Sequence, residues 1–222
     1  MFTSSSFPFD LDKLLDDVTA LAASLTGGTV HLRVLPRSTP AREPDEAAEA
    51  GTPLWRRLGV PPAYRGARVE DFAPEDFAGG AVPEIEQPRS LLVFGQTGVG
   101  KTDLAAAIAS RWEARWWLVP DLISQVRDGC RPDAEVSAFE VIERCVAAPL
   151  IVLDDITSSG TTEYGAKSLL LILERRIGEQ RPTIVTCCEG REAVERWSPS
   201  IASRLGGFER IELLGGDRRA GE

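Results

Sequence analysis

Lysine, histidine and cysteine are scarce in this chain of 222 residues. Lysine occurs only as Lys13, Lys101 and Lys167, and the single histidine is His31. The four cysteines form no C-x-x-C pair and no Cys/His cluster with the spacing of a zinc site. The sequence therefore excludes a zinc-centred fold and favours a cytoplasmic protein with reduced thiols.

Long apolar runs are also absent. No segment is apolar over the roughly 18 residues that a spanning helix needs, and the first ten residues lack the basic start and apolar core of a signal peptide. We therefore expect no membrane association. The formal net charge of −9 excludes a broad basic face for coating duplex DNA, because phosphate neutralisation needs clustered Lys and Arg. Any contact with nucleic acid should be local.

The chain divides into a small N-terminal part and one larger domain. Apolar residues recur at helical spacing from Leu11 to Leu25, residues 29–35 alternate like a short strand, and residues 36–53 are rich in Pro, Ala and Glu. We interpret residues 1–53 as a tethered element with a linker, and residues 54–222 as the main domain. The amphipathic helix either packs on that domain or offers its apolar face to a partner.

From residue 91 onward, apolar strands alternate with helices. The strands are expected at Leu91–Phe94, Trp116–Val119, Leu150–Asp154, Thr183–Cys187 and Arg210–Leu213, and the helices at Thr102–Trp112, Asp121–Asp128, Glu135–Ala147, Tyr164–Gly178 and Arg191–Trp197. Continuous apolar strands between helices predict an α/β fold in which a five-stranded parallel sheet is covered on both faces.

A phosphate-binding loop follows the first of these strands. The pattern comprises Gly95, Gln96, Thr97, Gly98, Val99, Gly100, Lys101 and Thr102. A strand that feeds a glycine turn, with a helix beginning at the turn, is the setting in which backbone N–H groups wrap phosphate. Lys101 would reach the terminal phosphates of ATP, and Thr102 would bind Mg²⁺. The alternative is a glycine turn beside a surface lysine.

Asp154 and Asp155 end the buried apolar run that begins at Leu150. Ligands of such sheets gather beyond the carboxyl ends of the strands. Asp154 would hold the Mg²⁺ shared with Thr102, and Asp155 would orient or deprotonate the attacking water. A helix cap or a solvated turn is the alternative interpretation.

The strand ending in Thr186-Cys187-Cys188 should lie between the other two, with its end beside the γ-phosphate. Either Thr186 supplies a sensing hydroxyl there, or a weakly polar cysteine thiol takes that position. A buried cysteine pair without a role is the alternative. Further on, Arg204 either completes the site of a neighbouring subunit or forms a surface salt bridge.

In this order, the motifs resemble the AAA+ ATPases of the DnaC/IstB group, which comprise replicative-helicase loaders and transposition helper ATPases. The resemblance covers about residues 54–219, with a lead-in at 54–90 and a core from 91. Its specific marks are Gly-Val-Pro-Pro-Ala-Tyr-Arg at 59–65, Glu-Asp-Phe at 70–72 and Gly-Asp-Arg-Arg at 216–219.

The resemblance also implies roles for residues. It gives Lys101 and Thr102 to phosphate and Mg²⁺, Asp154 and Asp155 to Mg²⁺ and water, and Arg204 to an arginine finger. Arg219 would be a second sensor on the nucleotide phosphates. Cys188 stands where the first sensor of the group is usually asparagine.

Thr162 and Tyr164 match a segment that contacts single-stranded DNA in the loaders of this group. A hydroxyl can hold a phosphate and a tyrosine ring can stack on a base without a basic face. A threonine that caps a helix and a tyrosine packed in the core are the competing interpretations.

The sequence thus predicts an ATP-hydrolysing AAA+ protein that loads a replicative helicase onto single-stranded DNA. Its subunits would associate head to tail, and the N-terminal helix would hold the helicase. An IstB-like transposition helper is the alternative, which the charge of −9 disfavours because such a helper should bind duplex DNA. A nucleotide-dependent kinase lacks its arginine lid here, and a non-catalytic module with a relic loop stays open.

Overall fold

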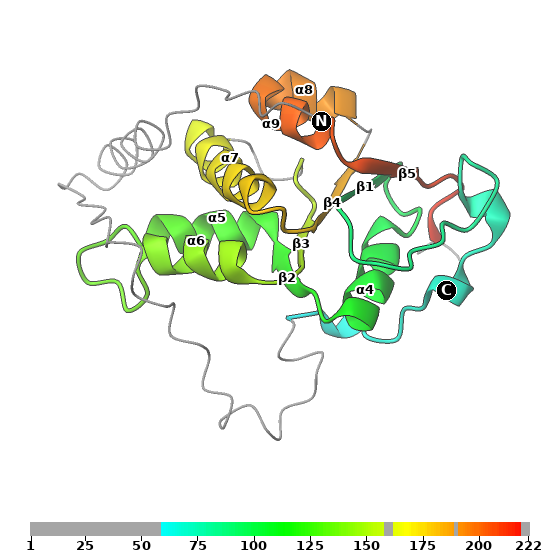
Figure 1. Cartoon of the computed structure of the whole chain (residues 1–222), viewed down its shortest axis with the longest axis horizontal. Helices are drawn as coiled ribbons and strands as arrows, with labels where there is room; N and C mark the ends of the chain where they lie inside the picture. The colour runs from blue at the N-terminus through cyan, green and yellow to red at the C-terminus, as the bar shows by residue number, and fades with distance from the viewer. Residues whose placement is uncertain (1–58, 158–161, 189–190, 219–222) are drawn as a thin grey trace, which may run out of the picture.

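Five parallel strands form the centre of the molecule (Figure 1). The structure is a computed structural model that describes residues 59–157, 162–188 and 191–218, so the N-terminal helix at 11–25, the strand at 29–35 and Arg219 lie outside the described residues. The strands are β1 (Leu91–Gly95), β2 (Arg115–Leu118), β3 (Ile151–Asp154), β4 (Thr183–Cys188) and β5 (Glu209–Glu212). Their order is β2-β3-β4-β1-β5. The parallel sheet and the central place of β4 between β1 and β3 are confirmed.

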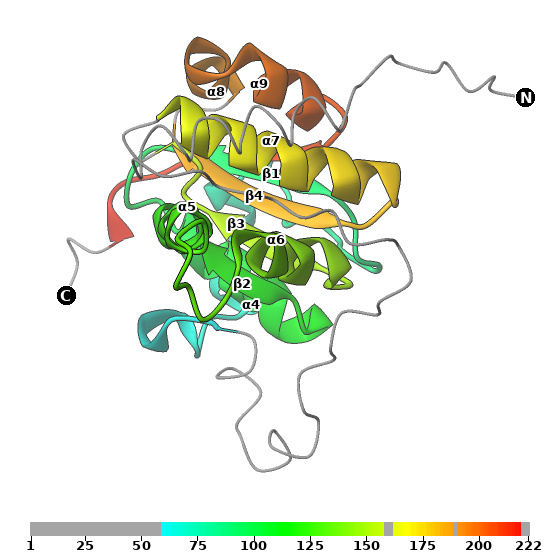
Figure 2. The same ribbon diagram turned by 90° about the vertical axis from the view of Figure 1, so that its left-hand side faces the viewer.

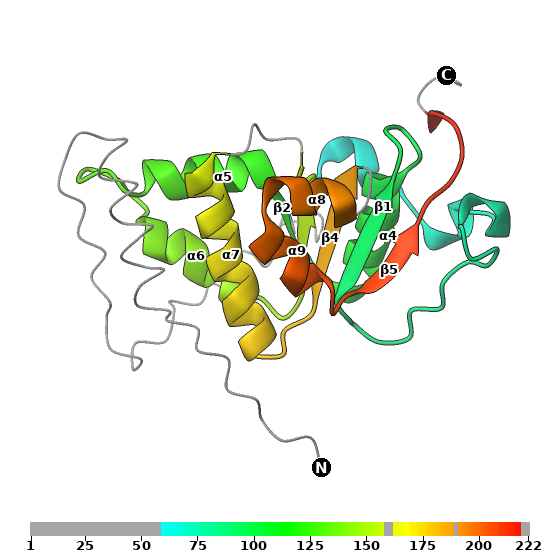
Figure 3. The same cartoon turned by 90° about the horizontal axis from the view of Figure 1, so that it is seen from above.

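Helices cover both faces of the sheet, as predicted. One face carries α4 (Lys101–Trp112) and the lead-in. The other carries α5 (Val119–Asp128), α6 (Ala138–Ala147), α7 (Glu163–Gly178), α8 (Arg191–Trp197) and α9 (Pro199–Leu205). Figures 1 and 3 show α5, α6 and α7 on the side of the sheet opposite α4, and Figure 2 looks onto these three helices with the sheet behind them. No helix within the described ranges has the length and apolar character to cross a membrane.

Local hydrogen bonds explain where the helices differ from the sequence prediction. Helix α6 begins at Ala138 and not at residue 135, because Ser137 and Glu140 cap it reciprocally: the Ser137 hydroxyl accepts from the Glu140 N–H, and the Glu140 carboxylate accepts from the Ser137 N–H. Helix α9 was not predicted. Its signals are the Ser198 hydroxyl, which accepts from the Ile201 N–H, and Pro199 at the first helical position.

The lead-in wraps the α4 face and reaches the far edge of the sheet. It forms three short 3₁₀ turns, η1 (Pro62–Tyr64), η2 (Val69–Asp71) and η3 (Pro74–Asp76). Val60, Phe72 and Phe77 are buried in the same apolar cluster as α4. Beyond β5, Phe77 pairs with Leu213 in an isolated antiparallel bridge, and the Leu214 N–H donates to the Asp76 carbonyl at 2.8 Å. The lead-in and the residues after β5 therefore hold one another.

Arg176 on α7 is a fully buried cation that fixes the start of β4. Its Nε donates to the Thr183 hydroxyl at 2.8 Å, and its terminal nitrogen donates to the carbonyls of Cys145 and Ala148 at 2.7 Å each. These carbonyls lie at the end of α6, where the helix dipole favours a positive charge. Burial lowers the pKa of Arg176 to about 10. One side chain thus joins α6, α7 and the first residue of β4.

Candidate nucleotide-binding site

The phosphate loop leaves β1 at Gly95 and enters α4 at Lys101. Gly98 and Gly100 have φ of 88° and 95°, a left-handed conformation that residues with a Cβ rarely adopt. Space is as restrictive as conformation at Gly98, where a Cβ would lie 2.2 Å from Oδ1 of Asp217. The glycines therefore form the tight turn that presents backbone N–H groups at the start of α4.

Lys101 and Thr102 are the first two residues of α4. The Lys101 side chain points into the phosphate loop, and the Thr102 side chain points toward the end of β3. The Lys101 side chain is only 9% exposed, and its Nζ donates to the Gln96 carbonyl at 2.7 Å, which holds the ammonium inside the loop. The Thr102 hydroxyl donates to Oδ1 of Asp154 at 3.3 Å. The structure thus brings the loop and the carboxylate at the end of β3 together, although 52 positions separate them in the sequence.

Asp154 is a buried carboxylate, 5% exposed. Burial raises its pKa, and a hydrogen bond from the Thr186 hydroxyl opposes this by stabilising the ionised form. That hydroxyl donates to Oδ1 at 2.6 Å. Because both Thr186 and Thr102 bind Oδ1, neither hydroxyl uses Oδ2.

Asp155 has a left-handed backbone, with φ of 61°. Its N–H donates to the Thr186 hydroxyl at 2.8 Å, and the next N–H, of Ile156, donates to the Thr186 carbonyl at 3.0 Å. The chain therefore turns sharply at the end of β3 while staying bonded to β4. Nothing in the sequence signals this turn, since aspartate is only one of several residues that tolerate it.

The two sensor candidates on β4 occupy different places. Thr186 is 1% exposed and faces the two aspartates. Cys188, at the end of the strand, is half-buried, and its Sγ lies 3.9 Å from the Thr97 hydroxyl of the phosphate loop. Cys187 is buried in the core on the α5–α9 side. The thiol that faces the loop is therefore the one that the resemblance gave to the sensor position, and Thr186 binds the carboxylate of Asp154 and the backbone of Asp155.

Arg204 lies in the last turn of α9 and forms an ion pair with Glu174 of α7. Its side chain is 30% exposed. This is the surface salt bridge that was one of its two interpretations. Part of the side chain is nevertheless exposed to solvent, which the other interpretation requires.

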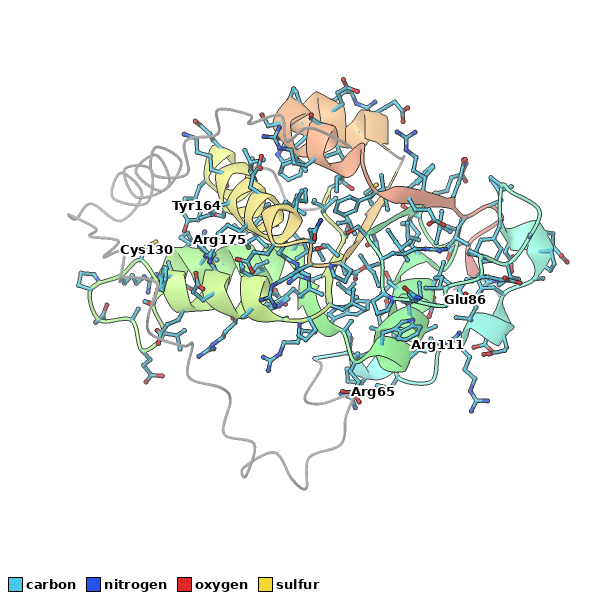
Figure 4. All side chains as sticks on the ribbon, viewed as in Figure 1. Arg65, Glu86, Arg111, Cys130, Tyr164 and Arg175 are labelled. Atoms are coloured by element: carbon cyan, nitrogen blue, oxygen red, sulfur yellow. The ribbon has the colours of Figure 1, made fainter. Side chains whose placement is uncertain are left out.

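Thr162 and Tyr164 have structural roles here. The Thr162 hydroxyl accepts from the Gly165 N–H and caps α7, but the residue is exposed. The prediction that the Tyr164 ring stacks on a base is corrected, because this ring is 2% exposed and packs in the core. Its hydroxyl lies 3.4 Å from Sγ of Cys130, which is in the turn after α5, and Figure 4 shows the two side chains together at one end of the helical layer.

Asp217 and Arg218 reach the phosphate loop from the other end of the chain. The Arg218 N–H donates to the Gly98 carbonyl at 3.0 Å, and its guanidinium binds the Asp76 carboxylate at 2.6 Å. The same guanidinium lies 4.4 Å from the ring centroid of Phe72. Sequence reasoning gave this end of the chain to Arg219 and missed Arg218. The adjacent pair Gly215-Gly216, typical of a tight turn after a strand, was the available signal.

The donor set fits a nucleotide with Mg²⁺. Within the described residues, no cluster of three His, Cys, Asp or Glu side chains could hold a metal ion by itself. Mg²⁺ commonly takes one or two protein ligands and completes its shell with phosphate and water oxygens. The Thr102 hydroxyl and the Asp154 carboxylate supply such a pair. A cavity of about 500 Å³ also opens beside the loop, with Gly95, Gln96 and Val99 in its wall.

Comparison with known proteins extends these observations. No family model matches the sequence. Among curated proteins, the 26S proteasome regulatory subunit 4 homolog of Dictyostelium discoideum is 31% identical over 85 residues, which cover 38% of this chain and 19% of that protein. The chain thus spans about a fifth of the curated relative that it matches.

Solved structures resemble much more of the chain. The DnaC helicase loader superposes with a TM-score of 0.50 and 20% identity over 66% of this chain and 84% of its own. DnaI gives 0.50 and 18% identity over 82% of this chain and 95% of its own. AMPPCP-bound DnaA from Aquifex aeolicus gives a TM-score of 0.54 and 16% identity over 72% of this chain and 53% of its own. The fold is that of the AAA+ P-loop proteins.

The AAA+ fold confirms the resemblance to the DnaC group that the motifs predicted, at the level of the fold. It also gives the site a frame. In this AAA+ sheet, β1 lies next to β4 and β4 next to β3. The phosphate loop, Cys188 and Asp154 therefore lie together at the carboxyl ends of three neighbouring strands. A structure related in this way, that of DnaA, was solved with a nucleotide analogue bound.

Proposed function

We propose that this protein binds and hydrolyses Mg²⁺-ATP and uses the cycle to load a replicative helicase onto single-stranded DNA. The contact between Thr102 and Asp154, which joins the phosphate loop to the acidic end of β3, carries the first part of the proposal. The likeness in fold to the DnaC helicase loader supports the second part.

The roles of the residues in hydrolysis follow from their positions. The ammonium of Lys101, held at the mouth of the glycine turn, would exchange the Gln96 carbonyl for phosphate oxygens. The Thr102 hydroxyl and the Asp154 carboxylate would hold Mg²⁺, which neutralises charge on the phosphates. Asp155 would orient the attacking water and accept its proton, and Cys188 would face the terminal phosphate from β4.

Arg204 would complete the site of a second copy of the chain. We propose that it leaves Glu174 on head-to-tail association and places its guanidinium on the phosphates bound by the neighbour, where an arginine stabilises developing charge. Arg219 remains the candidate second sensor, and Arg218 is the residue beside it that contacts the loop.

The proposed contact with single-stranded DNA is limited to the start of α7. The exposed Thr162 can still donate its hydroxyl hydrogen to a phosphate while it caps the helix. The helix at residues 11–25 would hold the helicase through its apolar face.

ATP hydrolysis by the purified protein tests the first part. Lys101→Ala should abolish nucleotide binding, whereas Asp155→Asn should retain binding of ATP and lose hydrolysis. Lys167→Ala is the matched control, because Lys167 forms an ion pair with Glu163 on the surface of α7. Hydrolysis that survives Lys101→Ala would sink the ATPase assignment.

Mixing two inactive variants tests the shared site. Arg204→Ala and Asp155→Asn should each be inactive alone, and their mixture should recover part of the activity because one interface then holds both intact residues. Arg175→Ala is the control, since Arg175 also pairs with a carboxylate on this face, that of Glu143, and is 24% exposed. No recovery in the mixture would count against the arginine finger.

Delivery of the helicase to a single-stranded DNA circle tests the second part. The full chain should deliver the replicative helicase of its source organism in the presence of ATP, and Leu14→Asp combined with Leu21→Asp should fail to do so while hydrolysis persists. Specific capture of a transposase by the full chain, with no delivery of helicase, would replace the loader with a transposition helper.

A further inference from the structure

We propose that Thr186 is the positioning residue of this site, and that its single hydroxyl sets both the metal-binding carboxylate and the water-orienting carboxylate. The inference rests on the proposed ATPase function and deepens it. It assigns Thr186 a place behind the two aspartates, distinct from a sensor in contact with nucleotide.

The hydrogen-bond directions at this hydroxyl are fully determined. The Asp155 backbone N–H can only donate, so the Thr186 oxygen accepts from it at 2.8 Å. The hydroxyl hydrogen is then available for the Asp154 carboxylate, whose Oδ1 lies 2.6 Å away. One oxygen atom thus joins the side chain of Asp154 to the backbone of Asp155.

This junction is buried. Thr186 is 1% exposed and Asp154 is 5% exposed, so water has little access to replace either bond. A buried carboxylate without donors and a buried N–H without an acceptor are both costly. The backbone bond from the Ile156 N–H to the Thr186 carbonyl, at 3.0 Å, closes the turn from the other side.

The left-handed turn at Asp155 depends on this support. A φ of 61° is uncommon for a residue with a side chain, and such conformations persist where the surroundings hold them in place. If the hydroxyl is removed, the turn can relax toward an ordinary conformation, which would swing the Asp155 carboxylate away from the phosphates. The Oδ1 of Asp154 would keep only the Thr102 hydroxyl, at 3.3 Å.

Valine and serine separate the hydroxyl from the shape of the side chain. Thr186→Val keeps the branched shape and removes the oxygen, and Thr186→Ser keeps the oxygen and removes the methyl group. Ile184→Val is the matched control, because Ile184 is a buried residue two positions earlier on the same strand, faces the same α4 side of the sheet and does not touch the aspartates through a polar group. It reports what a general loosening of β4 does to the site.

The experiment measures kcat, the Mg²⁺ concentration at half-maximal rate, and the affinity for a fluorescent ATP analogue in EDTA. Thr186→Val should lower kcat by about 10- to 100-fold and raise the Mg²⁺ requirement, the effect typical of losing a partner behind a metal ligand. Its affinity in EDTA should stay within about twofold, because the phosphate loop is intact. Thr186→Ser should stay within about threefold of the wild type in all three measurements.

Two kinetic outcomes overturn the proposal: wild-type kcat and Mg²⁺ dependence in Thr186→Val, or a Thr186→Ser variant as impaired as Thr186→Val. If Thr186→Val does not fold, Thr186→Ala carries the same expectation. Amide hydrogen exchange at Asp155 keeps the test independent of ATPase activity. Exchange there should accelerate in Thr186→Val and not in Ile184→Val; equal protection in all variants overturns the positioning role even if the wild type hydrolyses no ATP.

Discussion

The phosphate loop takes its support from distant parts of the chain, whereas the two aspartates of the site are held by the strand beside them, one through its carboxylate and the other through its backbone. Asp217 and Arg218 lie against the loop glycines, and the lead-in holds Arg218 through Asp76. On the acidic side, one threonine of β4 binds both aspartates at the end of β3. The support of the phosphate loop depends on the lead-in and on the residues after β5 (213–218, hereafter the tail). The support of the aspartates depends on the sheet alone.

The two kinds of support also differ in their exposure to solvent. The ion pair between Arg218 and Asp76 is solvent-accessible, with side chains 35% and 21% exposed, and such pairs contribute little stability. The bonds at Thr186 are buried. We therefore expect nucleotide binding to be adjustable through the lead-in and tail, and the geometry of hydrolysis to be fixed by the core.

The largest expected effect tests how Arg176 holds β4, the strand that supports the two aspartates. Arg176→Met should destabilise the fold by about 3–5 kcal/mol, because it leaves buried carbonyls of Cys145 and Ala148 without their donor. Denaturant unfolding measures this. Arg175→Met is the control from the next position, since Arg175 is partly exposed and its loss should cost about 1 kcal/mol or less. Equal losses in both variants would show that β4 is not held by Arg176.

The second-largest expected effect tests the support of the phosphate loop. Gly98→Ala combines a φ of 88° with a Cβ placed 2.2 Å from Asp217, so the loop must distort. We expect about 1–3 kcal/mol of strain and at least a tenfold loss of nucleotide affinity, measured by titration with an ATP analogue. In Gly178→Ala, a Cβ at the end of α7 meets nothing within 4 Å, and affinity should not change. Unchanged affinity in Gly98→Ala would mean that the tail does not constrain the loop.

The sequence predicted the loop side more completely than the acidic side. The glycine pattern with its lysine and threonine predicts a turn between a strand and a helix, because those residue types are required by backbone conformation and phosphate geometry. The place of β4 between β1 and β3 is confirmed as well. Both predictions rest on patterns that are local or general to parallel sheets.

The parts that the sequence did not predict depend on contacts between distant residues. The left-handed turn at Asp155 needs a hydroxyl from β4, 31 positions away, and the contact of Arg218 with Asp76 spans 142 positions. The place of Tyr164 also depends on a contact with a distant residue. Its neighbours in the sequence leave stacking and packing equally open, and only its burial beside Cys130 decides between them.

A smaller effect should be visible where the two sides meet. Cys188 is the one cysteine of the four that is not buried, and its Sγ lies 3.9 Å from the Thr97 hydroxyl. Iodoacetamide should therefore modify Cys188 first, while burial raises the pKa of Cys145 to about 12 and keeps that thiol inert. Mg²⁺-ATP should slow the modification about tenfold by covering the loop, as mass spectrometry of the labelled peptide would show. In Cys188→Ser the fast reaction should disappear; a rate unaffected by nucleotide would place the thiol away from the phosphates.

The smallest effect tests the adjustable support itself. Arg218→Ala removes the ion pair with Asp76 and the contact with the Phe72 ring, interactions that each contribute about 0.2–1 kcal/mol at exposed sites. Stability should change by no more than their sum. Nucleotide affinity should fall several-fold, because alanine keeps the backbone N–H that donates to Gly98 but loses the side-chain contacts that hold this N–H against the loop. Arg131→Ala, which breaks an exposed ion pair with Asp128, should alter neither property. If Arg218→Ala instead tightens nucleotide binding, then the residues after β5 compete with phosphate for the loop.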